Sequence, residues 1–97
     1  MIKVIVKKNE IVVTGHSGYE EYGKDIVCAA VSSTVLTTIN AILSIDSSSI
    51  SVTEGKELKV EILKHDNNID ILINNMINML SELENDYSKY IKVIKEG

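Results

Sequence analysis

The sequence predicts an α+β domain in which two helices pack against a mostly antiparallel sheet, with the element order ββαββαβ. Four short segments alternate apolar and polar residues with the period of two that is typical of half-buried strands. Two longer segments repeat apolar residues with helical spacing, and a fifth short apolar segment follows the second of them. This order is most simply satisfied by one layer of helices on one layer of sheet.

The N-terminal part is expected to form a hairpin followed by a loop. Residues 2–6 alternate apolar and polar side chains, residues 8–10 are typical of a tight turn, and residues 11–14 form the second strand. Residues 15–24 then contain three glycines and no periodicity. We interpret them as a surface loop, which is a common location for functional residues.

The first helix is expected to run over residues 26–44, with Asp25 as its N-cap. An aspartate carboxylate at that position accepts hydrogen bonds from backbone N–H groups of the first turn. Cys28 would then be the third residue of the helix. Because apolar residues cover much of its circumference, we expect this helix to be largely buried.

The C-terminal half repeats the hairpin and helix. Residues 50–53 and 58–63 flank a charged turn at 54–57, and residues 67–86 have one apolar and one polar face. A last strand is expected at 90–94.

Length and charge limit the possible functions. The chain of 97 residues is predicted to be a single domain, residues 1–97, with room for a modest core. Its net charge is -4, and all ten basic residues are lysine. Without a basic surface or an arginine fork for phosphate, nucleic acid is not expected as a direct partner.

The single cysteine excludes an internal disulfide, and no Cys/His spacing resembles a zinc site. We therefore expect neither a metal nor another cofactor. The N-terminal residues have no continuous apolar stretch that would indicate a signal peptide or a membrane helix. A soluble, cytoplasmic protein without a membrane partner is expected.

Cys28 and His16 are the residues with the clearest chemical potential. A cysteine nucleophile needs a thiolate, an imidazole that carries its proton, and donors for the oxyanion. In the first turn of the predicted helix, the dipole would favour the thiolate, and the free N–H groups of Val27 and Cys28 would be oxyanion donors. Eleven residues separate His16 from Cys28, enough for the chain to fold back, and Asp25 would either orient the imidazole or cap the helix.

The same residues are also compatible with purely structural, non-catalytic roles. Cys28 among small apolar neighbours is also typical of a buried core residue. His16 is compatible with an exposed loop histidine, and Ser32 with a helix serine that donates to the carbonyl of Cys28. His65, next to Asp66, is interpreted as an exposed turn residue.

A longer pattern connects these residues. Gly15-His16 is followed by an eleven-residue spacer that contains glycine, and the block from Asp25 to Ala30 reads Asp-Ile-Val-Cys-Ala-Ala, with Ser32 shortly after. This pattern resembles the ribosomal-processing cysteine protease family of bacteria. The resemblance covers essentially the whole chain and is strongest over residues 14–33.

The resemblance implies a catalytic dyad of Cys28 and His16, with Asp25 and Ser32 in supporting positions. It implies a substrate as well, the N-terminal extension of large-subunit ribosomal protein twenty-seven in its precursor form, cut after a short aromatic or hydrophobic motif. It further implies a homodimer with a mobile loop between His16 and Cys28.

The loop between the dyad residues is the expected contact with the substrate peptide. Tyr19 and Tyr22 are candidates for touching it. Gly15, Gly18 and Gly23 would let the loop close on it.

Two rival functions are compatible with the sequence. One is a binding protein without catalysis, in which the loop recognises a ribosomal or other partner and Cys28 is part of the core. The other is a redox-sensing thiol, which would react only between molecules because no second cysteine is present to resolve it.

Overall fold

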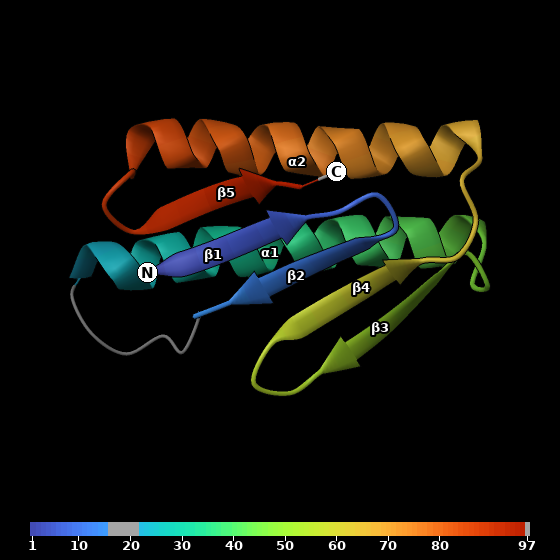
Figure 1. Ribbon diagram of the computed structural model, residues 1–97, viewed down its shortest axis with the longest axis horizontal. Coiled ribbons are helices and arrows are strands. Elements are labelled where there is room, and N and C mark those ends of the chain that lie inside the picture. The colour runs from blue at the N-terminus through green and yellow to red at the C-terminus, as the bar shows by residue number, and fades with distance from the viewer. Residues whose placement is uncertain (16–21, 97) are drawn as a thin grey trace.

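The structure is a computed structural model that describes residues 1–15 and 22–96, with only the backbone described for residues 22–25. Its elements are β1 (Ile2–Val6), β2 (Glu10–Thr14), α1 (Tyr22–Ile45), β3 (Ile50–Glu54), β4 (Leu58–Ile62), α2 (Asn67–Asp86) and β5 (Ile91–Lys95). The predicted α+β class and the order ββαββαβ are thereby confirmed (Figure 1).

The five strands form one sheet in the order β3-β4-β2-β1-β5. The pairs β1–β2, β2–β4 and β3–β4 are antiparallel, and β1–β5 is parallel. The parallel pair joins the two ends of the chain, with Ile2 opposite Ile91. The sheet is therefore mostly antiparallel, as predicted.

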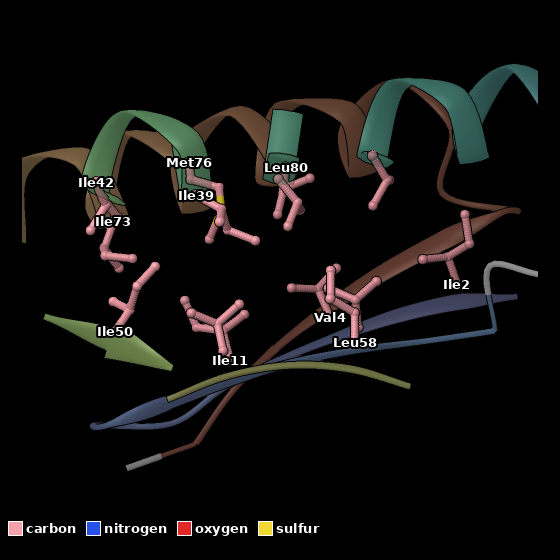
Figure 2. Packing of buried hydrophobic residues seen from close by; sticks show 14 of the residues in the cluster. Ile2, Val4, Ile11, Ile39, Ile42, Ile50, Leu58, Ile73, Met76 and Leu80 are labelled. Carbon is pink, nitrogen blue, oxygen red and sulfur yellow. The ribbon is translucent and has the colours of Figure 1, made fainter. Parts of the chain in front are cut away.

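Both helices lie on the same face of the sheet, and the core fills the space between the layers (Figure 2). Alternation along the strands explains this arrangement: Ile2 and Val4 are buried whereas Lys3 between them is exposed. The radius of gyration is 12.9 Å, close to the value of about 12.5 Å expected for a compact chain of this length. The molecule is a compact globular domain.

Helix α2 has the bounds that its periodicity predicts. Its inward face buries Ile69, Ile73, Met76 and Leu80. Asp66 caps its N-terminus: the residue is extended, and its carboxylate accepts a hydrogen bond of 2.9 Å from the backbone N–H of Ile69.

Helix α1 begins at Tyr22, which corrects the prediction that Asp25 is its N-cap. Asp25 is instead the fourth helical residue and Cys28 the seventh. Extending a helix that has already nucleated adds one backbone hydrogen bond per residue, which offsets the unfavourable propensity of Gly23. The sequence pattern missed this extension because it lies before the apolar repeat begins.

Residues 26–45 of α1 contain no charged side chain, and by length and composition alone this segment could cross a membrane. The same test is passed by core helices of globular proteins. Here Val27, Val31, Val35 and Ile42 are buried in the core beneath the sheet. The apolar character of the segment is therefore explained on its inner side by the fold.

The turn from α1 to β3 is held by Asp46. Its carboxylate accepts hydrogen bonds from the hydroxyl and the backbone N–H of Ser48, at 2.7 and 2.9 Å, and lies 3.4 Å from the ammonium of Lys64. These hydrogen bonds, assisted by Lys64, hold the pKa of Asp46 below its ordinary value of 3.8. Ser49 continues the turn, since its buried hydroxyl donates to the carbonyl of Asp46 at 2.7 Å.

Candidate active site

Cys28 lies at the edge of the core. It is the seventh residue of α1, its relative exposure is 7%, and it belongs to the same buried cluster as Val27 and Val31. The packing that the structural interpretation expected is therefore present. A small remaining exposure leaves Cys28 at the boundary between core and surface.

The expected oxyanion donors are not available from the backbone of α1. Only the first N–H groups of a helix lack a partner within it. Val27 and Cys28 are the sixth and seventh residues of α1, so their N–H groups belong to the helical hydrogen-bond ladder. That prediction was wrong because the helix starts before Asp25. The influence of the helix dipole, which falls off within the first turn, is weakened at Cys28 for the same reason.

Ser32 lies one helical turn after Cys28 and is half-buried. Its hydroxyl does not donate to the carbonyl of Cys28 within the described part of the chain. The residues of α1 that do bond back in this way are Thr38, to Thr34, and Ser44, to Asn40. Ser32 instead lines a cavity of about 130 Å³ with Val13 of β2.

Gly15 ends the described chain on the histidine side of the site, directly before His16. Its φ is +76°, in the left-handed region that favours glycine. A Cβ built on Gly15 would overlap the carbonyl oxygen of Met1 and lie 3.2 Å from its carbonyl carbon. Gly15 was predicted as part of a closing loop, and the structure adds a reason in backbone geometry why a glycine stands there.

The structure describes only some of the remaining predicted site residues. His16, Gly18 and Tyr19 lie outside the described residues. Tyr22 and Gly23, predicted in the loop, are helical residues of α1 instead, and their side chains, like that of Asp25, are outside the description. The His16–Cys28 dyad and the supporting role of Asp25 therefore stay predictions.

His65 is exposed, as predicted, but it is not without partners. Its Nδ1 lies 2.9 Å from the carboxylate of Asp70, and its Nε2 lies 2.7 Å from the side-chain oxygen of Asn9. These contacts tie the β1–β2 turn to the start of α2. Figure 1 shows this turn and the start of α1 at opposite ends of the domain.

Within residues 1–15 and 22–96, no three His, Cys, Asp or Glu side chains gather closely enough to hold a metal ion.

Comparison with known proteins gives the family. The family described as cysteine protease Prp matches residues 1–92. This chain belongs to that family. The match includes Gly15, His16 and the block around Cys28, and it confirms both the family and the enzyme class that the sequence pattern predicted. The protein is a cysteine protease.

Individual relatives agree over the full length. The ribosomal processing cysteine protease Prp of Mycoplasma genitalium is 27% identical and is matched over 100% of this chain and 98% of its own. Two crystal structures of the ribosomal processing protease Prp from S. aureus share the fold, with TM-scores of 0.87 and 0.85. They are 23% and 24% identical, and each matches 99% of this chain and 100% of its own. One holds a covalently linked product peptide and the other a substrate peptide.

Proposed function

We propose that this protein is an endopeptidase that removes the N-terminal extension of large-subunit ribosomal protein twenty-seven, with Cys28 as nucleophile and His16 as general base and acid. One observation carries the assignment of the nucleophile. The chain belongs to a family of cysteine proteases and contains a single cysteine. A thiol nucleophile in this chain is therefore Cys28.

His16 is supported as its partner by the position of the other histidine. The chain has two histidines. Both ring nitrogens of His65 are engaged, by Asp70 and by Asn9, at the end of the domain away from the start of α1. His16 follows Gly15, at the end of β2 that leads into α1.

The reaction follows from these roles. His16 takes the proton of the thiol, the sulfur of Cys28 bonds to the scissile carbonyl carbon, and the carbonyl oxygen takes up negative charge. As the C–N bond breaks, His16 gives its proton to the leaving amine. Water, deprotonated by His16, then attacks the thioester, releases the new carboxylate and restores the thiol.

The supporting residues have distinct roles in this proposal. Ser32, half-buried and one turn from Cys28, steadies the site with its hydroxyl. Asp25 orients the imidazole of His16. Tyr19, and Tyr22 at the start of α1, contact the peptide, and closure of the segment between the dyad residues uses Gly18.

The substrate assignment is supported by the relatives. Those in Mycoplasma genitalium and S. aureus are named for ribosomal processing, and one S. aureus structure holds a substrate peptide. A precursor of a ribosomal protein is met in the cytoplasm, where the lone thiol also stays reduced. The cytoplasm is therefore the proposed location.

A homodimer is proposed through the outward side of α1. Six exposed residues follow heptad spacing there and carry no charge: Ile26, Ala29, Ser33, Leu36, Asn40 and Leu43. Spacings of three and four residues are those by which two helices pack along a seam. An uncharged stripe of this length is unusual for a helix face in water, and a second copy of the same stripe would cover it.

The catalytic assignment is tested by incubating the full-length ribosomal precursor with the protein and identifying the products by mass spectrometry. Wild type is expected to release the extension. Cys28→Ala is expected to bind without cleaving, and His16→Ala to slow cleavage by at least about 100-fold, the range of general base catalysis. His65→Ala is the matched control and is expected to retain the wild-type rate. Cleavage by Cys28→Ala would refute the proposed nucleophile.

The dimer is tested by light scattering of the purified protein. Wild type is expected at twice the mass of the chain, and Leu43→Glu at the mass of one chain because each new carboxylate would be buried in the apolar seam without a partner. Ile71→Glu, at an exposed position of α2, is the control that should stay dimeric. A wild-type protein of single mass would refute this part of the proposal.

A further inference from the structure

The cavity lined by Ser32, one helical turn after Cys28, is suited to one apolar side chain. It opens between α1 and the β3–β4 hairpin, has a volume of about 130 Å³, and is walled by Val13, Val31, Val35 and Leu58. A cavity of about 150 Å³ with aliphatic walls accommodates a benzene ring. The cavity is slightly smaller than this and therefore has room for a side chain the size of leucine.

The cavity is also at the right distance from the nucleophile. With a rise of about 1.5 Å per residue, Ser32 and Val35 in its wall lie about 6 and 10 Å beyond Cys28 along α1. An extended peptide advances about 3.3 Å per residue. A substrate whose scissile carbonyl meets the sulfur of Cys28 thus brings a side chain two or three residues away to the cavity.

The mouth of the cavity is acidic. Glu54, Gly55 and Glu57 of the β3–β4 turn line it. Within the described chain, neither glutamate side chain has a hydrogen bond or an ion pair. Lys56, which stands between them in the sequence, does not line the cavity. Two carboxylates without partners beside an apolar cavity favour a cationic group at its entrance.

We propose that this cavity is a specificity subsite, which takes an apolar side chain two or three residues from the scissile bond while Glu54 and Glu57 select a lysine or arginine next to it. The inference rests on the proposed function, since it takes Cys28 as the nucleophile. It deepens that function by naming which residues read the substrate and what they read.

A randomised peptide library, digested by the full chain and read by mass spectrometry, tests the subsite. In wild-type products, an apolar residue is expected at one position and a basic residue beside it, enriched about fivefold over acidic residues, the scale of one exposed ion pair. The variant Glu54→Lys/Glu57→Lys is expected to prefer an acidic residue at that position. Glu61→Lys/Glu82→Lys, with the same change in charge on exposed residues outside the cavity, should keep the wild-type preference.

The outcomes separate the subsite from the proteolysis. If wild type cleaves the library but the Glu54→Lys/Glu57→Lys variant keeps the same basic preference, the subsite is refuted and the proposed function stands. The same holds if wild-type products show no apolar residue beside the basic one. If wild type cleaves neither the library nor the precursor, the proposed function fails and this inference with it. Circular dichroism of each variant confirms that it is folded.

Discussion

Gly15 shows how the backbone of one residue can require glycine, directly before His16. It leaves β2 with a positive φ and passes so close to the carbonyl of Met1 that no side chain fits. The close approach links the first residue of the chain to the point where the segment with His16 begins. The sequence suggested that Gly15 gives the loop conformational freedom. The structure shows in addition that the close approach of Met1 requires a glycine directly after β2.

We predict that Gly15→Ala lowers both stability and cleavage. The left-handed conformation costs a residue with a Cβ about 1–2 kcal/mol, and the overlap with Met1 adds to this cost. Urea denaturation measures the loss, and the precursor assay measures the rate. Gly55→Ala is the matched control, because a Cβ at Gly55 meets nothing within 4 Å. Equal stability of the two variants would contradict the assigned role of Gly15.

At the scale of elements, the turn after α1 depends on an ionised side chain. Asp46 gathers the hydroxyl and N–H of Ser48 and the ammonium of Lys64 around one carboxylate. These partners lower its pKa, so the folded state holds the proton of Asp46 less tightly than the unfolded chain does. The stabilisation is therefore present above the ordinary value of 3.8 and is lost as pH falls through the lower pKa of the folded state.

We predict that Asp46→Asn melts below wild type at pH 7 and that the difference shrinks at pH values well below 3.8. Asparagine retains an acceptor oxygen for Ser48 but removes the charge, so the comparison isolates ionisation. Thermal unfolding followed by circular dichroism at both pH values measures it. A difference in melting temperature that is independent of pH would show that the charge of Asp46 does not stabilise the turn.

The two helices also show which helix bounds a sequence pattern can predict. Helix α2 was predicted with its observed bounds because its apolar period is clear from start to end. The start of α1 was not, since Tyr22–Asp25 lack that period and Asp25 mimics a cap. The actual cap of α2, Asp66, carries a signal that could have been used, an aspartate directly before the helix.

In the candidate site, the reactive residues could be predicted from the sequence, whereas the cavity near them could not. Cys28 and His16 were predicted from a spaced pattern of residue types, which needs no knowledge of packing, and as a catalytic pair they stay a prediction. The cavity beside Ser32 was not, because its walls come from β2, α1 and β4, which only the fold brings together. Likewise, nothing in the sequence around His65 indicates that Asn9, fifty-six residues earlier, lies against it.

At the scale of the whole molecule, the sheet pairs β1, near the start of the sequence, with β5, near its end. Strand β5 pairs with β1 over its whole length, and Ile2 and Ile91 are both fully buried where the strands meet. The backbone N–H of Ile2 donates to the carbonyl of Tyr90, and that of Glu96 to the carbonyl of Val6. The backbone N–H of Val93 also donates to the carboxylate of Glu84 in α2.

We predict that Ile91→Ala lowers the free energy of unfolding by about 2–5 kcal/mol, the cost of emptying a buried isoleucine site. Ile71→Ala is the control: Ile71 is 56% exposed on α2, so a change within about 0.5 kcal/mol is expected. Chemical denaturation of both variants measures the difference. Similar values for the two would mean that β5 contributes little to the folded state.

The parallel pairing of β1 with β5 has a consequence for how the enzyme folds during its synthesis. Its partner residues are almost the whole chain apart, and contacts of such long sequence separation form late and slowly. During synthesis from the N-terminus, one edge of β1 stays unpaired until the last strand has been made. An open edge of this kind invites pairing with other chains. The protease therefore completes this sheet only once β5 has been made, and until then the open edge of β1 is exposed to aggregation.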